Sequence, residues 1–254
     1  MKAIDFNCDM GEMPEALADG TQEELMRYIS SANIACGGHA GDADMMRVTI
    51  EQAVRYGVSV GAHPGYEDRE NFGRNELQIA PKEIANSVYR QIVALDAIAK
   101  QLGVTVAHVK AHGALYNQAA RDRTVAGAIA EGVRRWNRHA VIIGLAGSAM
   151  LEEFRAAGFS VAAEAFADRR YEGDGSLRLR KFPDALLRDT EEAAAQALRI
   201  VEQGMVIAAD GASVPVQADT ICIHGDTPGA SQIAAEIHRR FRQAGISIKA
   251  LSAK

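Results

Sequence analysis

Short apolar runs alternate along the chain with longer stretches in which apolar residues recur at helical spacing. The short runs predict strands at 3–9, 32–36, 59–63, 104–110, 140–145, 160–166, 220–224 and 247–251. The longer stretches predict amphipathic helices at 23–30, 43–56, 81–102, 124–136, 149–157, 190–203 and 231–244. A glycine follows several of these helices, as a left-handed C-terminal cap does, and a Val/Ile-rich run comes soon after it. This repeated unit predicts parallel βαβ crossovers.

The length of the chain is that of one parallel (β/α) barrel. We therefore expect residues 1–254 to form a single α/β domain, a TIM-barrel-like parallel barrel of seven to eight strands. Two apolar runs flank an Asp-Gly pair, which predicts a small hairpin insertion near 205–217. Residues 168–183 are rich in Arg, Gly and Asp and predict a long loop that acts as a lid or binding segment.

Composition excludes several classes of function. A net charge of −5 and a pI near 5.8 argue against a nucleic-acid surface. No apolar run approaches the roughly 20 residues that span a bilayer, and no secretory signal opens the chain, so no membrane role is expected. Cys8, Cys36 and Cys222 are scattered without C-x-x-C spacing, which argues against a disulfide framework and favours a cytoplasmic location.

Five predicted strands end in clusters of Gly, His and Asp, at 6–12, 33–39, 60–65, 109–113 and 221–226. Four of the seven histidines lie in these clusters: His39, His63, His112 and His224. The carboxyl ends of parallel strands meet on one face, and that face carries the active site of (β/α) barrels. The chain is therefore expected to be an enzyme.

Polar and apolar residues alternate in the first predicted strand, so Asp5, Asn7 and Asp9 share one face. In a barrel this face points to the interior, where polar groups are costly unless they are hydrogen-bonded or bind a ligand. Asp9 and Glu12 lie nearest the barrel mouth and are candidate acid/base or metal-binding groups. The alternative, a structural polar network, fits Asp5 better than Asp9.

The same period places His108, Lys110 and His112 on one strand face. On a strand, the two histidines would lie about 13 Å apart at ~3.3 Å per residue, too far to share a metal. A lysine in an apolar strand is expensive unless it pairs with a carboxylate or binds an anionic substrate, so we expect Lys110 to be functional. Tyr116 and Asn117 follow in a predicted loop and are expected to add hydrogen bonds.

His39 and His63 lie in glycine-rich strand ends, and with Asp9 they form a candidate His/His/Asp site for a divalent metal. The strand order brings these residues near one another but does not orient them, so an ordinary surface role stays open. Arg169 and Arg170 offer planar forks for carboxylate or phosphate, with exposed salt bridges as the alternative.

His224 and Asp226 precede a predicted helix N-terminus, which favours a bound anion. The chain contains no G-x-x-x-x-G-K-S/T phosphate-binding motif, so any use of a nucleotide requires a different binding motif or another chain.

The clusters together resemble the LamB/YcsF family. The matching stretches are D-F-N-C-D-M-G-E from Asp5, A-N-I-A-C-G-G-H-A-G-D from Ala32, G-A-H-P-G-Y from Gly61, V-K-A-H-G-A-L-Y-N from Val109, E-A-F-A-D-R-R-Y from Glu164 and H-G-D-T-P-G-A from His224. Ala111 departs from the pattern, since the family often has proline there. The resemblance implies a distorted (β/α) barrel similar to those of carbohydrate deacetylases and certain glycosidases.

The resemblance also implies a reaction, the ATP-dependent hydrolysis of 5-oxo-L-proline to L-glutamate by an A subunit that needs partner subunits B and C. ATP is then a co-substrate, with Mg²⁺ beside it or a metal in the site itself. The roles it suggests are Asp9 or Glu12 as base, Lys110 and Arg170 as anion clamps, and His39, His63, His112 and His224 as donors or proton shuttles.

Two other functions stay open. The first is a metal-dependent carbohydrate deacetylase or amidohydrolase that acts alone, without ATP. The second is a non-catalytic subunit that binds 5-oxoproline and presents it to partner enzymes. The density of polar groups at the predicted barrel mouth argues against binding alone.

Overall fold

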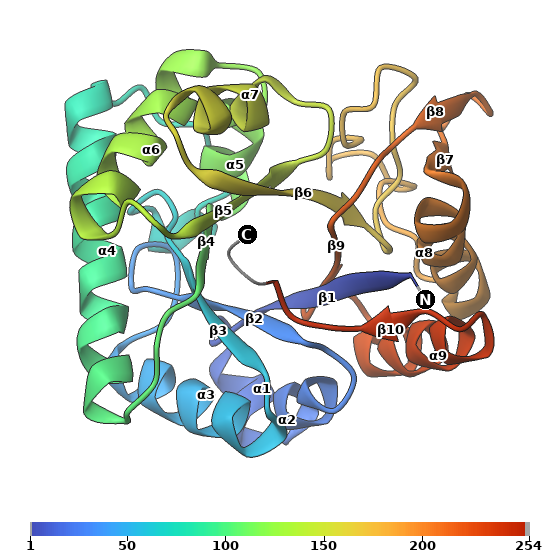
Figure 1. Ribbon diagram of the computed structural model, residues 1–254, viewed down its shortest axis with the longest axis horizontal. Coiled ribbons are helices and arrows are strands. Elements are labelled where there is room, and N and C mark those ends of the chain that lie inside the picture. Colours follow the sequence, from blue (N-terminus) through green and yellow to red (C-terminus); the bar gives the residue numbers. More distant parts are fainter. Residues whose placement is uncertain (1, 252–254) are drawn as a thin grey trace.

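The computed structural model describes residues 2–251, and parallel strands form a closed barrel at its centre (Figure 1). The barrel strands are β1 (Ala3–Met10), β2 (Ser31–Ala35), β3 (Ser59–His63), β4 (His108–Lys110), β5 (Val141–Leu145), β6 (Ser160–Phe166) and β9 (Thr220–His224). Each pairs in parallel with the next, and β9 closes the ring by pairing with both β6 and β1. The predicted parallel (β/α) barrel is confirmed, with seven strands in the ring among the described residues.

The last predicted strand, 247–251, lies outside the ring. Only β10 (Ser247–Ile248) forms there, and it pairs with Ala3 and Ile4 at the start of β1, before β9 joins β1 at Asp5. The predicted strand 104–110 is also shorter, because its ladder begins at His108. Val106 is buried although it precedes the ladder, which explains why the apolar run extends further than the strand.

Helices surround the barrel (Figure 1). They are α1 (Pro14–Ala18), α2 (Thr21–Met26), α3 (Ala43–Tyr56), α4 (Pro81–Gln101), α5 (Gly113–Ala119), α6 (Arg123–Trp136), α7 (Ala149–Ala156), α8 (Thr190–Gln203) and α9 (Ala230–Gln243), with a 3₁₀ turn η1 (Arg69–Asn71). Helices α1 and α5, of five and seven residues, were not predicted, and the predicted helix 23–30 is shorter, since α2 ends at Met26. Tyr116 and Asn117 therefore lie on a helix rather than in a loop. No helix within residues 2–251 is long and apolar enough to cross a membrane.

The alternation in β1 separates the two faces of the barrel wall as predicted. On the outer face, Phe6 is fully buried and meets Phe241 of α9 edge to face, with ring centroids 6.5 Å apart. On the inner face, the Oδ1 atom of Asp5 accepts hydrogen bonds from the hydroxyls of Ser30 and Ser31. Asp5 is thus part of a structural polar network at the lower end of the barrel.

A long excursion separates β6 from β9. It contains a loop that begins after Phe166, then α8, then an antiparallel hairpin of β7 (Met205–Ile207) and β8 (Ser213–Pro215). The loop is tied to the barrel, because the backbone N–H of Phe166 donates to the Tyr171 hydroxyl at 2.8 Å. The side-chain amide of Gln196 on α8 donates to the Phe166 and Arg169 carbonyls. These contacts hold the start of the loop over the barrel mouth.

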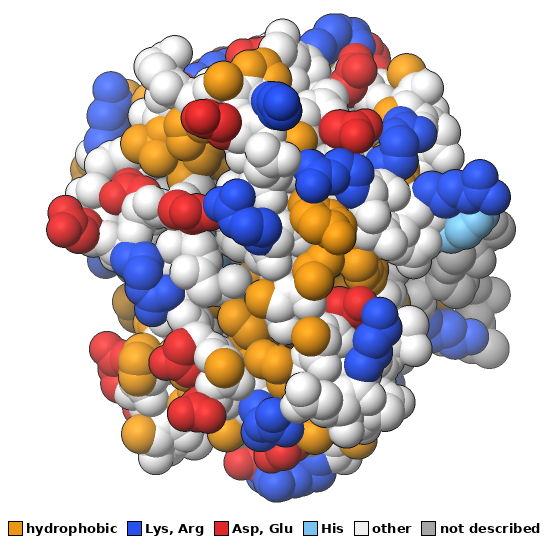
Figure 2. Space-filling view, turned by 90° about the vertical axis from the view of Figure 1, so that its left-hand side faces the viewer, with side chains coloured by type: hydrophobic (Ala, Val, Ile, Leu, Met, Phe, Trp, Pro, Cys, Tyr) orange, Lys and Arg blue, Asp and Glu red, His pale blue; other side chains and the backbone are white. Residues whose placement is uncertain are grey.

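Figure 2 shows the face of the molecule on which α4 lies. Lysine, arginine, aspartate and glutamate side chains are interspersed there with small hydrophobic patches. On this face, the drawn side chains form no extended basic surface of the kind that nucleic acids need.

Candidate active site

A cavity of about 1320 Å³ opens at the carboxyl ends of the barrel strands. Its wall includes most of the predicted site residues: Asp9, Glu12, His63, Lys110, His112, Tyr116, Asn117, Arg169, His224 and Asp226. Residues 172–177 and 179–182 of the long loop line it as well. Asn7 and His39 are buried behind the wall. Most of the predicted residues thus converge on one cavity, which is the candidate active site.

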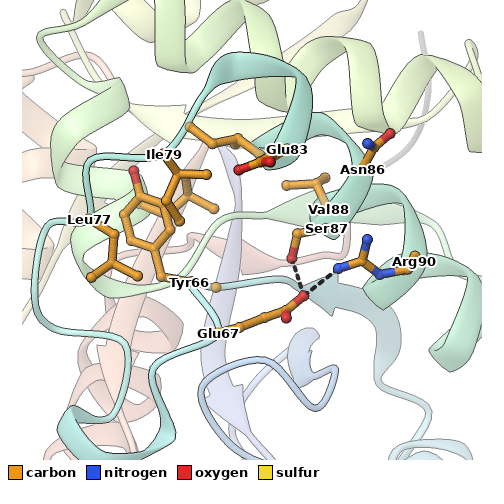
Figure 3. A pocket seen from close by; sticks show the side chains of 12 residues that line it. Tyr66, Glu67, Leu77, Ile79, Glu83, Asn86, Ser87, Val88 and Arg90 are labelled. Atoms are coloured by element: carbon orange, nitrogen blue, oxygen red, sulfur yellow. Dashed lines mark hydrogen bonds and ion pairs between the residues drawn. The ribbon is translucent and has the colours of Figure 1, made fainter.

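A second pocket, of about 400 Å³, lies outside the barrel between the loop that follows β3 and helix α4 (Figure 3). Three of its labelled polar groups are bonded to one another, since Glu67 accepts hydrogen bonds from Ser87 at 2.6 Å and from Arg90 at 2.7 Å. Apolar side chains such as Tyr66 and Ile79 form much of the remaining wall. The cluster of carboxylate, histidine and lysine side chains that a catalytic site requires therefore lies in the larger cavity.

Lys110 lies at the floor of the large cavity between two carboxylates. Its Nζ is 2.8 Å from Asp9 Oδ1, 3.0 Å from Glu164 Oε1 and 3.1 Å from Cys222 Sγ. Burial alone would lower the pKa of Lys110, but its acidic neighbours, Asp9 foremost among them, together outweigh burial and raise that pKa well above its usual value. Burial likewise opposes ionisation of Asp9, yet His63 and Lys110 hold its pKa well below the usual range. Both groups are therefore charged.

Glu164 is a site residue that the sequence prediction missed. It is fully buried in β6, and its Oε2 atom has no hydrogen-bond partner. Burial, and after it the charge of Glu164, raise the pKa of the Tyr116 hydroxyl well above its usual value. The sequence does contain a signal for Glu164, because burying a lone carboxylate in an apolar strand costs as much free energy as burying the ammonium of Lys110.

A layer of amides beneath the cavity orients these charges. The Asn7 amide donates to Glu164 Oε1 at 3.1 Å and to Thr220 Oγ1 at 2.6 Å. The Asn33 amide donates to Asn7 Oδ1 and Asp9 Oδ1, both at 2.8 Å. His108 Nε2 is 2.9 Å from Asn33 Oδ1, to which it donates. Asn7 therefore positions the catalytic candidates rather than facing the cavity itself.

A cluster of three histidines around Glu12 forms the second part of the site. Glu12 Oε1 lies 2.9 Å from His39 Nε2, 3.0 Å from His112 Nδ1 and 3.6 Å from His63 Nε2. Burial lowers the pKa of His39 to about 3, so that ring is neutral. Burial acts against the charged form of His63 too, but Asp9 and Glu12 raise its pKa. A carboxylate and imidazoles at these separations could hold a divalent ion.

This cluster differs from the predicted metal site of Asp9, His39 and His63. Both histidines are present, but Glu12 and His112 complete the group. Asp9 lies beside it, with Oδ2 3.3 Å from His63 Nε2, while its Oδ1 is held by Lys110. His108 lies apart from this cluster, since its Nε2 donates to Asn33 Oδ1 in the amide layer below.

Phe72 supports the histidine cluster and was also missed. Among the described residues it alone has a positive φ without being glycine, at 55°. That conformation turns its carbonyl toward His112 Nε2, 2.9 Å away, while its ring packs edge-on against His39 and His112. A strained backbone at such a place is typical of a functional site.

Cations and a carboxylate surround the outer part of the cavity. Arg180 Nη1 is 2.8 Å from Asp226 Oδ2, and Arg74 pairs with the same carboxylate. Arg169 is buried, its Nε has no partner, and burial together with Arg180 lowers its pKa to about 10. Asp226 thus holds cations in place rather than binding an anion by itself.

Arg170 does not line the cavity, contrary to the expectation that it binds an anionic group there. Its Nη2 lies 3.0 Å from Glu192 on α8, and its Nε donates to the Asp184 carbonyl. Arg180 occupies the place at the cavity that was expected for Arg170. The sequence could not distinguish these arginines, since the path of the loop depends on contacts with Phe166 and Gln196.

Asp168 orients His224 at the cavity wall. The carboxylate accepts the backbone N–H of His224 at 3.1 Å, its ring Nδ1–H at 3.0 Å and the Thr227 hydroxyl at 2.6 Å. Burial would raise the pKa of Asp168, but His224 and the Thr227 hydroxyl together outweigh burial and bring that pKa to about 2. His224 therefore presents its other ring nitrogen with a defined tautomer.

Replacing Asp168 with asparagine is expected to lower the free energy of unfolding at pH 7 by about 2 kcal/mol, because a carboxylate pKa below its unfolded value stabilises the fold. This stability is present above pH ~4 and is lost as the pH falls toward about 2, so the two proteins should converge in acid. Urea unfolding between pH 7 and pH 3 measures the effect. The exposed Asp174 of the same loop is the control, since Asp174→Asn should change stability by less than ~0.5 kcal/mol. A constant difference across this pH range would contradict the assignment.

Comparisons with known proteins agree with this architecture. Residues 4–254 match the LamB/YcsF family. The chain is 51% identical to the A subunit of 5-oxoprolinase from Chloroflexus aggregans over 98% of this chain and 99% of that protein, and 48% identical to the protein of the same name from Tolumonas auensis over 99% and 100%. The crystal structure of a lactam utilization protein from Thermus thermophilus is similar with a TM-score of 0.91 and 43% identity, covering 99% of this chain and 100% of that one.

A family 4 carbohydrate esterase from Streptomyces lividans shares the fold alone, with a TM-score of 0.51 and 11% identity over 99% of this chain and 94% of that one. The family match and the two relatives instead extend over nearly the whole chain, including every strand that contributes to the cavity. The chain belongs to the LamB/YcsF family.

Proposed function

We propose that this chain is the A subunit of an ATP-dependent 5-oxoprolinase, a hydrolase that opens the lactam ring of 5-oxo-L-proline to give L-glutamate. The observation that carries the proposal is the identity of about half of all residues, over nearly full length, with proteins that bear the name of this 5-oxoprolinase component. Similarity to a lactam utilization protein supports a cyclic amide as substrate.

The need for ATP follows from the substrate, because a five-membered lactam is an unreactive amide. Transfer of phosphate to its oxygen makes the ring carbon a better electrophile for water. In the balanced reaction, 5-oxo-L-proline, ATP and two water molecules give L-glutamate, ADP and phosphate. We assign ATP, with its Mg²⁺, to a complex of this chain with subunits B and C, and we place that complex in the cytoplasm because three buried free cysteines suit a reducing compartment.

The cavity offers the groups that this reaction needs. Asp9 or Glu12 is a base for water, Lys110 donates to a developing oxyanion, and Arg169 and Arg180 hold a carboxylate or phosphate. His224, oriented by Asp168, is a proton donor at the cavity wall. Tyr116 and Asn117 add hydrogen bonds from α5.

Glutamate release from 5-oxoproline tests the proposal. It should be measured with and without ATP, for this chain alone and for the chain co-purified with subunits B and C. Release that requires both ATP and the complex supports the proposal. Release by the chain alone without ATP would instead support a stand-alone metal-dependent amidohydrolase. Tight 5-oxoproline binding, together with an assembled enzyme whose activity does not fall when Asp9 is mutated, would support a non-catalytic binding role.

Replacing Arg180 with glutamine should raise the KM for 5-oxoproline by about 10- to 100-fold in the assembled enzyme, because a charge-assisted hydrogen bond contributes about 1.5–3 kcal/mol. Steady-state glutamate release measures the change. Arg170→Gln is the matched control and should leave KM unchanged, since Arg170 pairs with Glu192 away from the cavity. Equal effects of the two substitutions would contradict the placement of the anion site.

A further inference from the structure

One oxygen and two ring nitrogens on the cavity wall point at a common centre. Glu12 Oε1 and His112 Nδ1 are 3.0 Å apart, His112 Nδ1 and His63 Nε2 are 3.0 Å apart, and Glu12 Oε1 and His63 Nε2 are 3.6 Å apart. We infer that Glu12, His63 and His112 bind one divalent transition-metal ion of the Zn²⁺ class, with a coordination position open to the cavity, and that His39 positions Glu12 without being a ligand.

The hydrogen bonds on the far side of each ring decide which atoms face the centre. His63 Nδ1 lies 2.8 Å from the Lys110 carbonyl, and His112 Nε2 lies 2.9 Å from the Phe72 carbonyl. A carbonyl oxygen only accepts, so each of these nitrogens carries its hydrogen and donates. In the neutral rings, His63 Nε2 and His112 Nδ1 therefore present lone pairs to each other and to the Glu12 carboxylate. Backbone carbonyls that orient metal-bound histidines in this way are a common feature of metal sites.

A cation relieves these approaches more completely than a proton does. A proton on His63 Nε2 leaves His112 Nδ1 and Glu12 Oε1 facing each other with lone pairs at 3.0 Å, and a proton on His112 Nδ1 leaves the His63 Nε2 lone pair facing Glu12 Oε1 at 3.6 Å and Asp9 Oδ2 at 3.3 Å. Protons on both rings would place two N–H groups 3.0 Å apart, where they repel each other. A cation at the centre relieves all three approaches at once.

The dimensions and the charge of the site also fit a metal ion. Ligand atoms at about 2.0–2.1 Å from a tetrahedral Zn²⁺ are separated from one another by about 3.3 Å, close to the three distances observed. Asp9, Glu12 and Glu164 are three buried or nearly buried carboxyl groups in this region, and Lys110 is the one ammonium among them. A divalent ion would offset the remaining formal negative charge.

His39 is placed as a positioning residue. Its Nε2 donates to Glu12 Oε1 at 2.9 Å, but the residue is buried behind the cavity wall. Its ring is stacked in parallel on the His112 ring, with centroids 3.6 Å apart and planes within 2°, so the lone pairs of the two rings do not converge on one point. His39 therefore fixes the orientation of the Glu12 carboxylate.

The role of the ion rests on the proposed function, whereas its binding does not. When bound, such an ion supplies a Lewis acid for a carbonyl or phosphoryl oxygen, or for water. The neighbouring residues retain the roles proposed above, since Asp9 and Lys110 stay charged and Arg169 and Arg180 lie on the outer part of the cavity.

Metal binding to the isolated chain tests the inference. After removal of metals with a chelator, titration with Zn²⁺ and Co²⁺ by calorimetry should give one ion per chain, and the visible spectrum of the Co²⁺ protein should report a nitrogen- and oxygen-bound site of low coordination number. His63→Ala and His112→Ala should each weaken binding by more than ~100-fold. His39→Ala should weaken it by about 10- to 100-fold, the range for groups that only orient a ligand. His224→Ala, at the same cavity but bonded to Asp168, should bind like the wild type.

Near-ultraviolet circular dichroism and thermal unfolding establish whether each variant is folded. If an alanine variant does not fold, His63→Asn and His112→Asn retain an amide N–H for the backbone carbonyls, and the Co²⁺ spectrum of the wild type needs no variant. Failure of the wild type to bind either ion stoichiometrically would overturn the inference. Full binding by His112→Ala, or loss in His39→Ala as complete as in His63→Ala, would overturn the assigned ligands.

The result is distinguishable from a failure of the proposed function. ATP-dependent glutamate release by the complex after quantitative metal removal, with no metal bound by the chain, would overturn the inference and leave the proposed function in place. One bound ion per chain without any lactam opening in the complex would support the inference and count against the proposed function.

Discussion

Replacing Lys110 with methionine is expected to lower glutamate release by the assembled enzyme by at least about 10²–10³-fold, as the loss of one donor to a developing oxyanion does. It is also expected to lower the free energy of unfolding by about 3–5 kcal/mol, because the substitution leaves the buried Asp9 and Glu164 carboxylates without their shared cation. Steady-state kinetics and urea unfolding measure the two effects separately.

A surface lysine provides the control. Lys100 pairs with Asp96 at 2.7 Å, but its side chain is 73% exposed, so Lys100→Met should cost less than about 0.5 kcal/mol and leave activity unchanged. The double variant with Lys110→Met and Glu164→Gln removes one unpaired charge and should recover part of the stability but no activity. Recovery of activity in that variant would mean that Lys110 has only a structural role.

The interior of the barrel could be predicted from the sequence because it depends on a local rule. Alternation along β1 placed Asp5, Asn7 and Asp9 on the inner face, and the hydrogen bonds of Asn7 and Asp9 to neighbouring strands agree with this. The same alternation and the cost of burying a charge indicated a functional role for Lys110, which lies between two carboxylates in the cavity. Glu164 followed the same rule and could have been identified in the same way.

The sequence could not predict which carboxylate contacts which histidines, because these contacts depend on tertiary geometry. Asp9 and Glu12 are three positions apart near the end of β1, but Lys110 from β4 holds Oδ1 of Asp9, whose Oδ2 reaches His63, while Glu12 lies beside His39 and His112. The part played by His112 depends on the Phe72 carbonyl, which a loop from another βα unit supplies. No periodicity in the sequence encodes such a contact.

The positions of the loop arginines could not be predicted from the sequence either. The two neighbours Arg169 and Arg170 are equivalent in the sequence, yet one lines the cavity and the other pairs with α8. Arg180 comes to the cavity from the far end of the same loop. The loop is folded back by pairing between Tyr171 and Leu177, so the positions of its arginines follow from long-range contacts.

Replacing Gly61 with alanine is expected to lower the free energy of unfolding by about 3 kcal/mol or more, because an added methyl group would overlap the imidazole of His108 on the adjacent strand. Both residues are buried in the barrel wall, and Gly61 pairs with His108 in the β3–β4 register. Displacement of His108 also breaks its hydrogen bond to Asn33, which holds Asp9, so activity of the complex should fall as well. Urea unfolding and glutamate release measure both consequences.

A second substitution isolates the cause. Adding His108→Ala to Gly61→Ala removes the overlap, so the double variant should be more stable than Gly61→Ala alone, with a coupling energy of about 1–3 kcal/mol. Gly127 on α6 is the matched control, because a methyl group there meets only Glu153 at ordinary contact distance, and Gly127→Ala should raise stability by about 0.5–1 kcal/mol. Additive effects at positions 61 and 108 would contradict the steric explanation. Gly61, the first glycine of G-A-H-P-G-Y, is thus explained by a close approach between strands, which keeps the amide layer beneath Asp9 and Lys110 in register.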